Sequence, residues 1–260
     1  METAAGGSPV VRYAAVGDSF TEGVGDELPD GSTRGWADLV AAGLAAARTG
    51  GVLYANLAVR GRLLEPIAGE QLDAALALSP RPTLVTLNGG GNDMLRPRTD
   101  VAGLAASMAR AVVRCTAAGV RLVLLSGADP SDHLPFGRVV RRRGEELTAA
   151  VAELAAAHDL TMVDAFHDVE LRRPHYWSAD RLHLNAHGHR RVADLVLRAL
   201  GEPVAAAAVR ADSPRTRRLA AELGYYRRHV APWLGRRLRR RSSGDGRTGK
   251  HLTWTPVRTP

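Results

Sequence analysis

The sequence predicts a three-layer α/β/α fold built around a five-stranded parallel sheet. Five short apolar runs alternate with longer segments in which apolar residues recur at helical spacing. Such alternation is typical of βαβ units whose sheet is covered by helices on both faces. The right-handed crossover between parallel strands then favours a doubly wound sheet. With 260 residues, the chain is long enough for one sizeable domain and an appendage.

The first half of the chain supplies three of the strands. Residues 10–16 form an apolar run that breaks into small and polar residues, which indicates a buried strand followed by a turn. A helix begins at Trp36 and ends at a pair of glycines, and residues 52–58 form the second strand. Apolar spacing predicts another helix over 67–78, closed by two prolines. The third strand, 83–88, runs into a glycine-rich turn.

The second half supplies the other two strands and three helices. A helix over 104–118 ends at a glycine and precedes the strand 120–126. A proline-containing loop leads to a long helix over 137–158. The short strand 161–165 and a final helix over 186–200 complete the predicted domain.

Composition divides the chain into four parts. We assign residues 1–9 to a flexible N-terminus, 10–200 to the folded domain, 201–241 to a basic accessory helical segment and 242–260 to a disordered tail. The net charge of +8 arises after residue 200, where 14 Lys and Arg stand against four Asp and Glu, so the first 200 residues carry −2. The basic balance therefore says nothing about a pocket in the domain.

The Arg-rich tail allows three interpretations. Its leucines and aromatic residues recur at broken helical spacing, so it can pack on the domain as an accessory helix with its arginines in water. The alternatives to this first interpretation are an anionic membrane surface and, after it, a nucleic acid as the partner of the tail. Its aromatic residues do not discriminate among these partners.

Cysteine content and hydropathy point to the cytoplasm. Cys115 is the only cysteine, so an intramolecular disulfide is impossible, and its apolar helical surroundings indicate a small core residue. No run approaches the roughly 18 apolar residues of a membrane span. The first nine residues lack the basic and apolar regions of a secretory signal.

Polar groups follow several predicted strands and together suggest a catalytic site. Ser19 follows the first strand, Gly61 the second and Asn92 the third, while Asp180 and His183 precede the last helix. The carboxyl ends of parallel strands share one edge of a sheet, where such folds place reactive groups. The three-residue spacing lets the Asp180 carboxylate orient the His183 imidazole, which can then activate the Ser19 hydroxyl.

The same edge can also supply donors for an oxyanion. The backbone N–H groups of Ser19 and Gly61 and the side-chain amide of Asn92 are suitable hydrogen-bond donors. A glycine at a strand end lets the backbone approach a substrate closely. The parts of a serine esterase are therefore all present in the sequence.

Four sequence blocks, in this order, resemble the SGNH hydrolase superfamily, also called GDSL-type esterases and lipases. The blocks are Gly17-Asp18-Ser19-Phe20, Gly61, Gly90-Gly91-Asn92-Asp93 and Asp180-Arg181-Leu182-His183, followed by Asn185, Gly188 and His189. The one departure is Phe20, an apolar anchor where the family has Leu. The resemblance covers about residues 10–200.

The resemblance implies a flavodoxin-like fold and hydrolysis of carboxylic esters through an acyl-serine intermediate, with no metal and no cofactor. Ser19 would be the nucleophile, His183 the general base and then acid, and Asp180 the orienting carboxylate. Ser19, Gly61 and Asn92 would form the oxyanion hole. The substrate would be a small-molecule or lipid ester, with a thioester or a carbohydrate O-acetyl group as alternatives.

Structural roles compete with these assignments. Asn92 and Asp93 can cap the helix that follows them, and we favour this role for Asp93. Asp164, at the end of the fifth strand, can rival Asp180. Residues 176 and 177 are expected to pack the loop, Glu22 and Asp26 to be solvated loop charges, and His187 and His189 to lie in the first turn of the last helix, facing solvent. The three histidines 183, 187 and 189 offer no third ligand at metal-binding spacing.

A second function from another class is a phosphate- or polyanion-binding module. The Ser19 turn could bind an anion at a helix N-terminus, as in nucleotide-binding doubly wound domains. Such a turn has no need of Asp180 and His183, whose spacing therefore favours the esterase.

Overall fold

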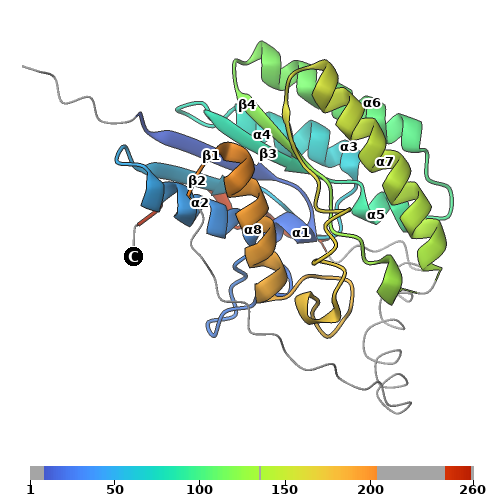
Figure 1. The fold of residues 1–260 in the computed structure, drawn as a ribbon. Helices are drawn as coiled ribbons and strands as arrows, with labels where there is room; N and C mark the ends of the chain where they lie inside the picture. The colour runs from blue at the N-terminus through green and yellow to red at the C-terminus, as the bar shows by residue number, and fades with distance from the viewer. Residues whose placement is uncertain (1–8, 135, 204–243, 259–260) are drawn as a thin grey trace, which may run out of the picture.

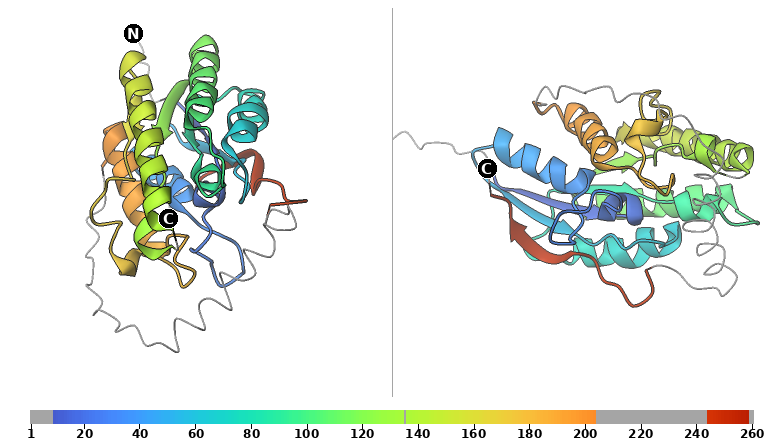
Figure 2. Two further views of the ribbon diagram at one scale, coloured as in Figure 1. Left: turned by 90° about the vertical axis from the view of Figure 1, so that its right-hand side faces the viewer. Right: turned by 90° about the horizontal axis from the view of Figure 1, so that it is seen from below.

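Six strands form a single sheet in the computed structural model, which describes residues 9–134, 136–203 and 244–258. Their order is β5-β4-β3-β1-β2-β6. The five predicted strands are confirmed as a parallel set: β1 (Val11–Val16), β2 (Val52–Asn56), β3 (Leu84–Asn88), β4 (Arg121–Leu125) and β5 (Thr161–Val163). Helices cover both faces, as the three-layer prediction requires (Figures 1 and 2).

The two faces of the sheet are covered by different helices. On one face α2 (Trp36–Ala47) packs beside α8 (Ala186–Leu200), and on the other α6 (Val101–Ala117) packs beside α7 (Gly137–Ala157). The apolar residues of β3 and residues Tyr13 to Val16 of β1 are fully or almost fully buried between these layers, whereas Val11 at the start of β1 is partly buried. Their continuous apolar runs are what a strand covered on both faces requires.

The helix predicted over 67–78 is divided in the structure. It consists of α3 (Leu64–Pro66), a π-helical turn Ile67–Gln71 and α4 (Leu72–Leu76). The wider π turn presents the Gln71 side chain to the sheet, where its Oε1 accepts a hydrogen bond from the N–H of Gly17 at 2.9 Å. This irregularity therefore supports the turn that follows β1.

The expected disordered tail over 242–260 is wrong for the residues described there. Residues His251–Pro256 form β6, which pairs antiparallel with β2 at the edge of the sheet (red in Figure 2). The backbone of β2 would otherwise leave its outer N–H and C=O groups unpaired, and β6 satisfies them. The indole N–H of Trp254 also donates to the carbonyl of Pro80 at 2.8 Å. The sheet thus has six strands rather than five.

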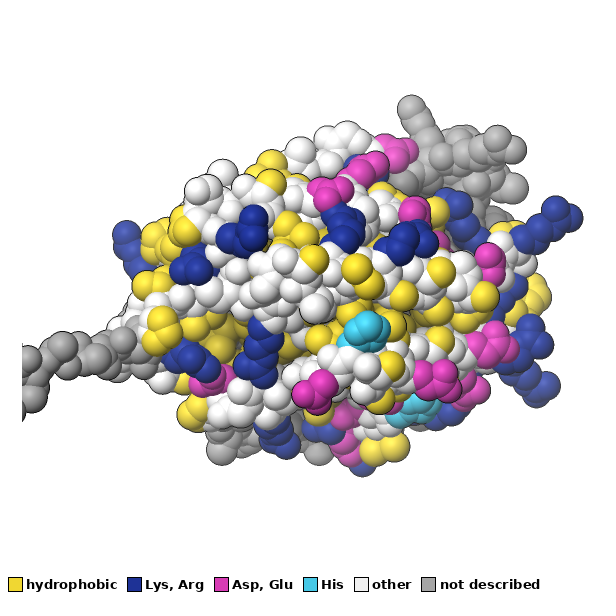
Figure 3. Space-filling view, turned by 90° about the horizontal axis from the view of Figure 1, so that it is seen from above, with side chains coloured by type: hydrophobic (Ala, Val, Ile, Leu, Met, Phe, Trp, Pro, Cys, Tyr) yellow, Lys and Arg dark blue, Asp and Glu magenta, His cyan; other side chains and the backbone are white. Residues whose placement is uncertain are grey.

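Part of the predicted organisation lies outside the described residues. This applies to residues 1–8 of the expected flexible N-terminus and to residues 204–243, which hold most of the expected basic accessory segment. Contact of the Arg-rich segment with a membrane surface or a nucleic acid stays a prediction. On the described surface of Figure 3, basic side chains are interspersed with acidic and apolar ones. Within the described ranges, no helix is long and apolar enough to cross a membrane.

Candidate active site

Ser19 is the first residue of α1 (Ser19–Glu22), a single helical turn that follows β1 at the centre of the sheet. Asp18 caps this turn, because its Oδ1 accepts a hydrogen bond from the N–H of Phe20 at 3.1 Å. The ring of Phe20 packs against the buried Trp36, with 5.8 Å between ring centroids. The turn is therefore fixed at both sides of Ser19, and the expected role of Phe20 as an apolar anchor agrees with this contact.

The structure brings Ser19, His183 and Asp180 together, although they lie far apart in the sequence. His183 Nε2 is 3.0 Å from Ser19 Oγ, and His183 Nδ1 is 2.6 Å from Asp180 Oδ2. The carboxylate accepts the Nδ1–H, which leaves Nε2 as the acceptor for the hydroxyl proton of Ser19. This is the arrangement that the three-residue spacing predicts.

The loop that carries His183 is held by hydrogen bonds within the loop, chiefly to the Asp180 carboxylate. Asp180 Oδ1 accepts hydrogen bonds from the N–H groups of Leu182 and His183, both at 3.0 Å, and from Ser178 Oγ at 2.6 Å. Arg181 adopts a φ of 58°, a conformation that non-glycine residues rarely take. The Ser178 N–H donates back to the carbonyl of His183 at 2.8 Å, so the imidazole stands on a closed turn.

The Asp180 carboxyl stays ionised in this environment. Burial alone would raise its pKa, but the hydrogen bond and charge of His183, with the donors in the turn, hold that pKa well below its ordinary value. A permanent carboxylate beside Nδ1 stabilises an imidazolium when Nε2 takes up a proton.

The predicted oxyanion donors lie on three neighbouring segments. The N–H groups of Ser19 and Gly61 find no acceptor among the described residues. Beyond β2 the chain continues beside the β1 turn, since the Val59 N–H donates to the carbonyl of Gly17 at 3.1 Å. Asn92 lines the same pocket as Ser19, and its Nδ2 lies 3.0 Å from both Asp18 Oδ2 and the carbonyl of Arg62.

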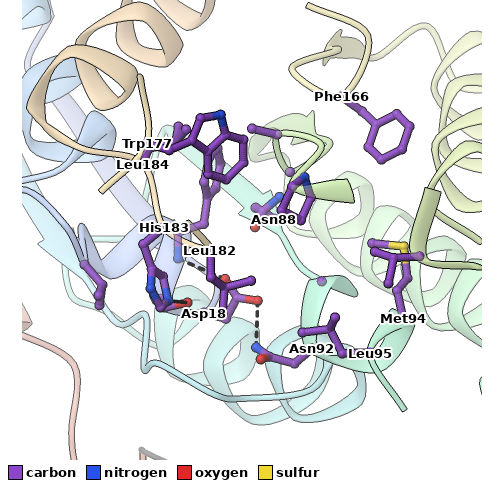
Figure 4. Close-up of a pocket in the computed structure, with 18 residues that line it drawn as sticks. Asp18, Asn88, Asn92, Met94, Leu95, Phe166, Trp177, Leu182, His183 and Leu184 are labelled. Atoms are coloured by element: carbon purple, nitrogen blue, oxygen red, sulfur yellow. Dashed lines mark hydrogen bonds between the residues drawn. The ribbon is translucent and has the colours of Figure 1, made fainter. Parts of the chain in front are cut away.

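Asp18 is a buried carboxyl directly beside the proposed nucleophile. Burial raises its pKa to about 6, while hydrogen bonds from the Phe20 N–H and the Asn92 amide oppose that shift. Figure 4 shows its contact with Asn92 at the wall of the pocket. Asp18 was not predicted as a site residue, although its position within the Gly17-Asp18-Ser19 block was the available signal.

Glu22 and Asp26 are not solvated loop charges, contrary to expectation. Glu22 is 8% exposed and Asp26 is 4% exposed. Glu22 Oε1 pairs with the Arg60 guanidinium at 2.5 and 2.8 Å, while Oε2 accepts the Arg60 N–H at 2.7 Å. Asp26 pairs with Arg34 at 2.9 Å. Each carboxylate is buried because a cation compensates it, and the first pair joins α1 to the residue before Gly61.

Asp164 does not compete for His183. Its Oδ2 lies 2.7 Å from Nδ1 of His167, three residues further on, and its Oδ1 lies 3.2 Å from Ser126 Oγ. The His167 side chain is 52% exposed, against 20% for His183. Asp93 also differs from expectation, because it lies within α5 (Gly91–Met94) and its Oδ2 accepts the Leu64 N–H at 3.0 Å.

The other two histidines of the block lie in the first turn of α8, as predicted, but they differ in burial. His187 is exposed, whereas His189 is 1% exposed, so the expectation that both face solvent is wrong for His189. His189 Nδ1 accepts the Trp36 N–H at 3.3 Å, and Nε2 donates to the carbonyl of Val24 at 3.1 Å. Among the described residues, no group of three His, Cys, Asp or Glu side chains is placed to hold a metal ion.

A mainly apolar pocket opens beside Ser19 and His183. Figure 4 shows Trp177 and Leu184 on one side and Phe166, Met94 and Leu95 on the other, with Asn88 between them. Trp177 packs the loop, as expected, because its Nε1–H donates to the carbonyl of Leu171 at 2.7 Å, and its side chain also lines the pocket. Tyr176 is buried among core residues, as expected for a residue that packs the loop.

Comparisons with known proteins agree with this geometry. The model of the GDSL-like lipase/acylhydrolase family matches residues 15–191. A search of curated proteins finds no match.

Three solved structures illustrate the likeness of the fold. An acetylxylan esterase from Geobacillus stearothermophilus has 18% identity and a TM-score of 0.61, over 75% of this chain and 95% of that one. A psychrotrophic esterase from Pseudoalteromonas sp., inhibited by monoethylphosphonate, has 18% identity and a TM-score of 0.57, over 73% and 96%. A lipase/acylhydrolase from Enterococcus faecalis has 22% identity and a TM-score of 0.57, over 76% and 100%.

Proposed function

The chain belongs to the GDSL-like lipase/acylhydrolase family and hydrolyses carboxylic esters, and from this premise we propose that it does so through an acyl-serine intermediate formed on Ser19. The observation that carries the proposal is the unbroken contact from Ser19 Oγ to His183 Nε2 at 3.0 Å and from His183 Nδ1 to Asp180 Oδ2 at 2.6 Å. This order of hydroxyl, imidazole and carboxylate is that of a catalytic triad.

The reaction begins when Ser19 Oγ attacks the ester carbonyl and His183 Nε2 takes its proton. The Asp180 carboxylate stabilises the resulting imidazolium. The N–H groups of Ser19 and Gly61 donate to the oxyanion, together with the Asn92 amide. His183 then protonates the departing alcohol, and the same imidazole activates a water molecule that releases the acid from Ser19.

The pocket supports an ester with an apolar acyl group. Its walls beside Ser19 carry Met94, Leu95, Phe166 and Trp177, whose side chains favour hydrocarbon over a sugar or phosphate. The buried Asp18 carboxyl beside Ser19 also disfavours a bound anion, so the polyanion-binding alternative gains no support here. Acyl esters and acyl thioesters both carry such an apolar acyl group, so the pocket walls do not distinguish between these two substrate classes.

The test is hydrolysis of p-nitrophenyl acetate, butyrate and octanoate by the wild type and three variants. We expect Ser19→Ala and His183→Ala to lower kcat/KM by about a thousandfold or more. His167→Ala is the matched control, because it removes a histidine with the same aspartate contact whose ring makes no hydrogen bond to a serine hydroxyl among the described residues. Its activity should equal that of the wild type. A higher kcat/KM for octanoate than for acetate is expected from the apolar walls.

Two results would contradict the proposal. Activity that survives Ser19→Ala would exclude Ser19 as the nucleophile. A fluorophosphonate that modifies the wild type at a residue other than Ser19 would do the same. A preference for acetate would overturn only the expectation that the pocket favours an apolar acyl chain. A separate comparison of an octanoyl ester with an octanoyl thioester shows which leaving group the enzyme prefers.

A further inference from the structure

Residues 244–258, here called the C-terminal strap, lie against the loop that leads from β2 to Gly61. A Cβ on Gly249 would stand 2.6 Å from Leu57 Cα, and one on Gly244 would stand 2.0 Å from the carbonyl oxygen of Arg60. Real Cβ atoms do not approach other atoms so closely, so only glycine allows the strap to lie here. The strap is thus in backbone contact with the segment that holds the proposed oxyanion donor Gly61.

Lys250 extends from the strap to the C-terminal end of α1. Its Nζ donates to the carbonyl of Glu22 at 2.8 Å, to the carbonyl of Thr33 at 3.0 Å and to Asp38 Oδ2 at 2.6 Å. The Lys250 side chain is only 18% exposed. Glu22 is the last residue of α1, which begins with Ser19, so one ammonium fixes the far end of the turn that carries the nucleophile.

The choice of lysine at this position fits its three partners. Lys250 is the only lysine of the sequence, and the other 34 of the 35 Lys and Arg residues are arginines. An ammonium is compact and directs three N–H bonds apart, which matches three oxygens around one point. The planar fork of a guanidinium suits a carboxylate edge instead, as in the Arg60–Glu22 pair.

The contacts of Lys250 and Arg60 converge on Glu22. Lys250 holds its backbone carbonyl, while Arg60 holds its carboxylate through both the guanidinium and the backbone N–H. Gly61 is the next residue after Arg60. Glu22 therefore joins the turn that carries the Ser19 hydroxyl to the segment that carries the Gly61 N–H, and Lys250 of the strap holds this joint in place.

We propose that Lys250 is a positioning residue for ester cleavage, setting where Ser19 stands relative to the Gly61 N–H. This inference rests on the proposed function, in which both groups act on the same carbonyl. Without Lys250, substrate still enters the pocket, whose walls the strap does not form, but the oxyanion meets its donors less well. The inference therefore predicts a loss in kcat rather than in KM.

The experiment measures kcat and KM for a p-nitrophenyl ester at a temperature well below the melting temperature of every variant. Lys250→Met should lower kcat by about 10- to 100-fold, with KM within about twofold of the wild type. The double variant Lys250→Met/Asp38→Asn removes the charge left without its cation, so it keeps the test valid if the single variant fails to fold. It should show the same loss in kcat.

The matched control is Trp254→Phe, which weakens the other end of the strap. It removes the hydrogen bond from the indole to the carbonyl of Pro80 and should lower the melting temperature without lowering kcat. Pro80 precedes β3, whereas α1 follows the parallel strand β1, so the two lie at opposite ends of the strands. If Lys250 served stability alone, the two variants would behave alike.

Each outcome has a defined meaning. A kcat of the folded Lys250 variants equal to that of the wild type, or lowered no more than in Trp254→Phe, would overturn the inference. Labelling with a fluorophosphonate separates this failure from that of the proposed function. A wild type labelled at Ser19 keeps the proposed function, whereas a wild type not labelled there loses both.

Discussion

Two aspartate–histidine pairs in this chain share their spacing and nearly share their geometry. Asp164 and His167 approach to 2.7 Å, and Asp180 and His183 approach to 2.6 Å. The difference lies at the opposite nitrogen, because His183 Nε2 meets Ser19 Oγ, whereas the His167 ring is half exposed. An oriented imidazole becomes a base for catalysis only where a hydroxyl stands beside it.

This pair of pairs gives the first prediction. Asp180→Asn should lower kcat by about 1,000- to 10,000-fold, because an amide does not stabilise the imidazolium and can favour the wrong tautomer of His183. Asp164→Asn changes the same atoms at the other pair and should leave kcat unchanged. Steady-state kinetics of the two variants decide, and equal losses in both would contradict the assignment of Asp180.

Asp18 gives a second prediction at the scale of one residue. Burial raises its pKa from 3.8 to about 6, so the folded state holds the proton more tightly than the unfolded state. Stability from this group is full below pH 4, falls as the pH rises to about 6, and stays lost at neutral pH. Asp18→Asn should therefore increase the free energy of unfolding by about 1 to 3 kcal/mol at pH 7.5.

The same substitution should cost activity. The carboxylate orients the Asn92 amide, and an amide in its place lacks the charge to do so, so kcat should fall by about tenfold. Urea unfolding at pH 4 and pH 7.5, beside kinetics, checks both effects. A variant less stable than the wild type at pH 7.5 would refute the cost assigned to this buried carboxylate.

At the scale of elements, α1 is too short to hold Ser19 by itself. A single helical turn has little stability of its own, so its position depends on the elements around it. Glu22 joins it to the loop after β2, Phe20 packs on α2, and His189 of α8 binds the loop that follows α1. The proposed nucleophile is therefore fixed by elements from both halves of the chain.

His189 makes one of these joints sensitive to acid. Burial lowers its pKa to about 4, against opposing effects of the Val24 carbonyl and Asp26, so the folded state holds it neutral. Stability from the neutral form is complete above pH 6.5 and is lost as the pH falls toward 4. Between pH 7 and pH 4.5 the wild type should lose about 1 to 3 kcal/mol more than His189→Gln. Denaturant unfolding of both proteins at the two pH values checks this. The same difference in free energy of unfolding between wild type and variant at pH 7 and at pH 4.5 would refute it.

Which elements the sequence could predict follows from how they are buried. β1 to β5 and the long helices have apolar faces on the core, so their spacing identified them. β6 has no such run, because it is a half-exposed edge strand with alternating threonines and a proline beside an arginine-rich segment. Its partner is β2, at the opposite end of the sequence, and no local pattern records that pairing.

The candidate site also divides into residues that a local sequence pattern marks and residues whose partners lie far away in the sequence. Ser19, Gly61, Asn92, Asp180 and His183 were predicted as site residues because each stands at a strand end or a helix start within a short motif. The burial of Glu22, Asp26 and His189 was not predicted, because the local sequence around a charged or polar residue does not show a partner that lies far away in the chain. Arg60, Arg34 and Trp36 supply those partners only in the folded chain.

For the whole molecule, β6 covers an edge of the sheet that would otherwise be exposed. Deletion of residues 244–260 should leave the outer edge of β2 open to pairing with another chain, so the shortened protein should associate and melt at a lower temperature. Deletion of residues 258–260 alone keeps β6 and is the matched control. Light scattering and thermal denaturation compare the two shortened proteins. If the protein without residues 244–260 stays monomeric and keeps the melting temperature of the control, the role given to β6 is refuted.

The pairing of β6 with β2 also bears on the order in which the strands assemble during folding. Asn56 stands opposite His251, so this contact closes a loop that includes most of the chain, and its entropic cost is repaid only after β1 to β5 have assembled. The strap therefore joins late in refolding from denaturant. Far-ultraviolet circular dichroism should recover first and the rate of ester cleavage afterwards, because the turn that carries Ser19 gains its last restraints from the final strand to arrive.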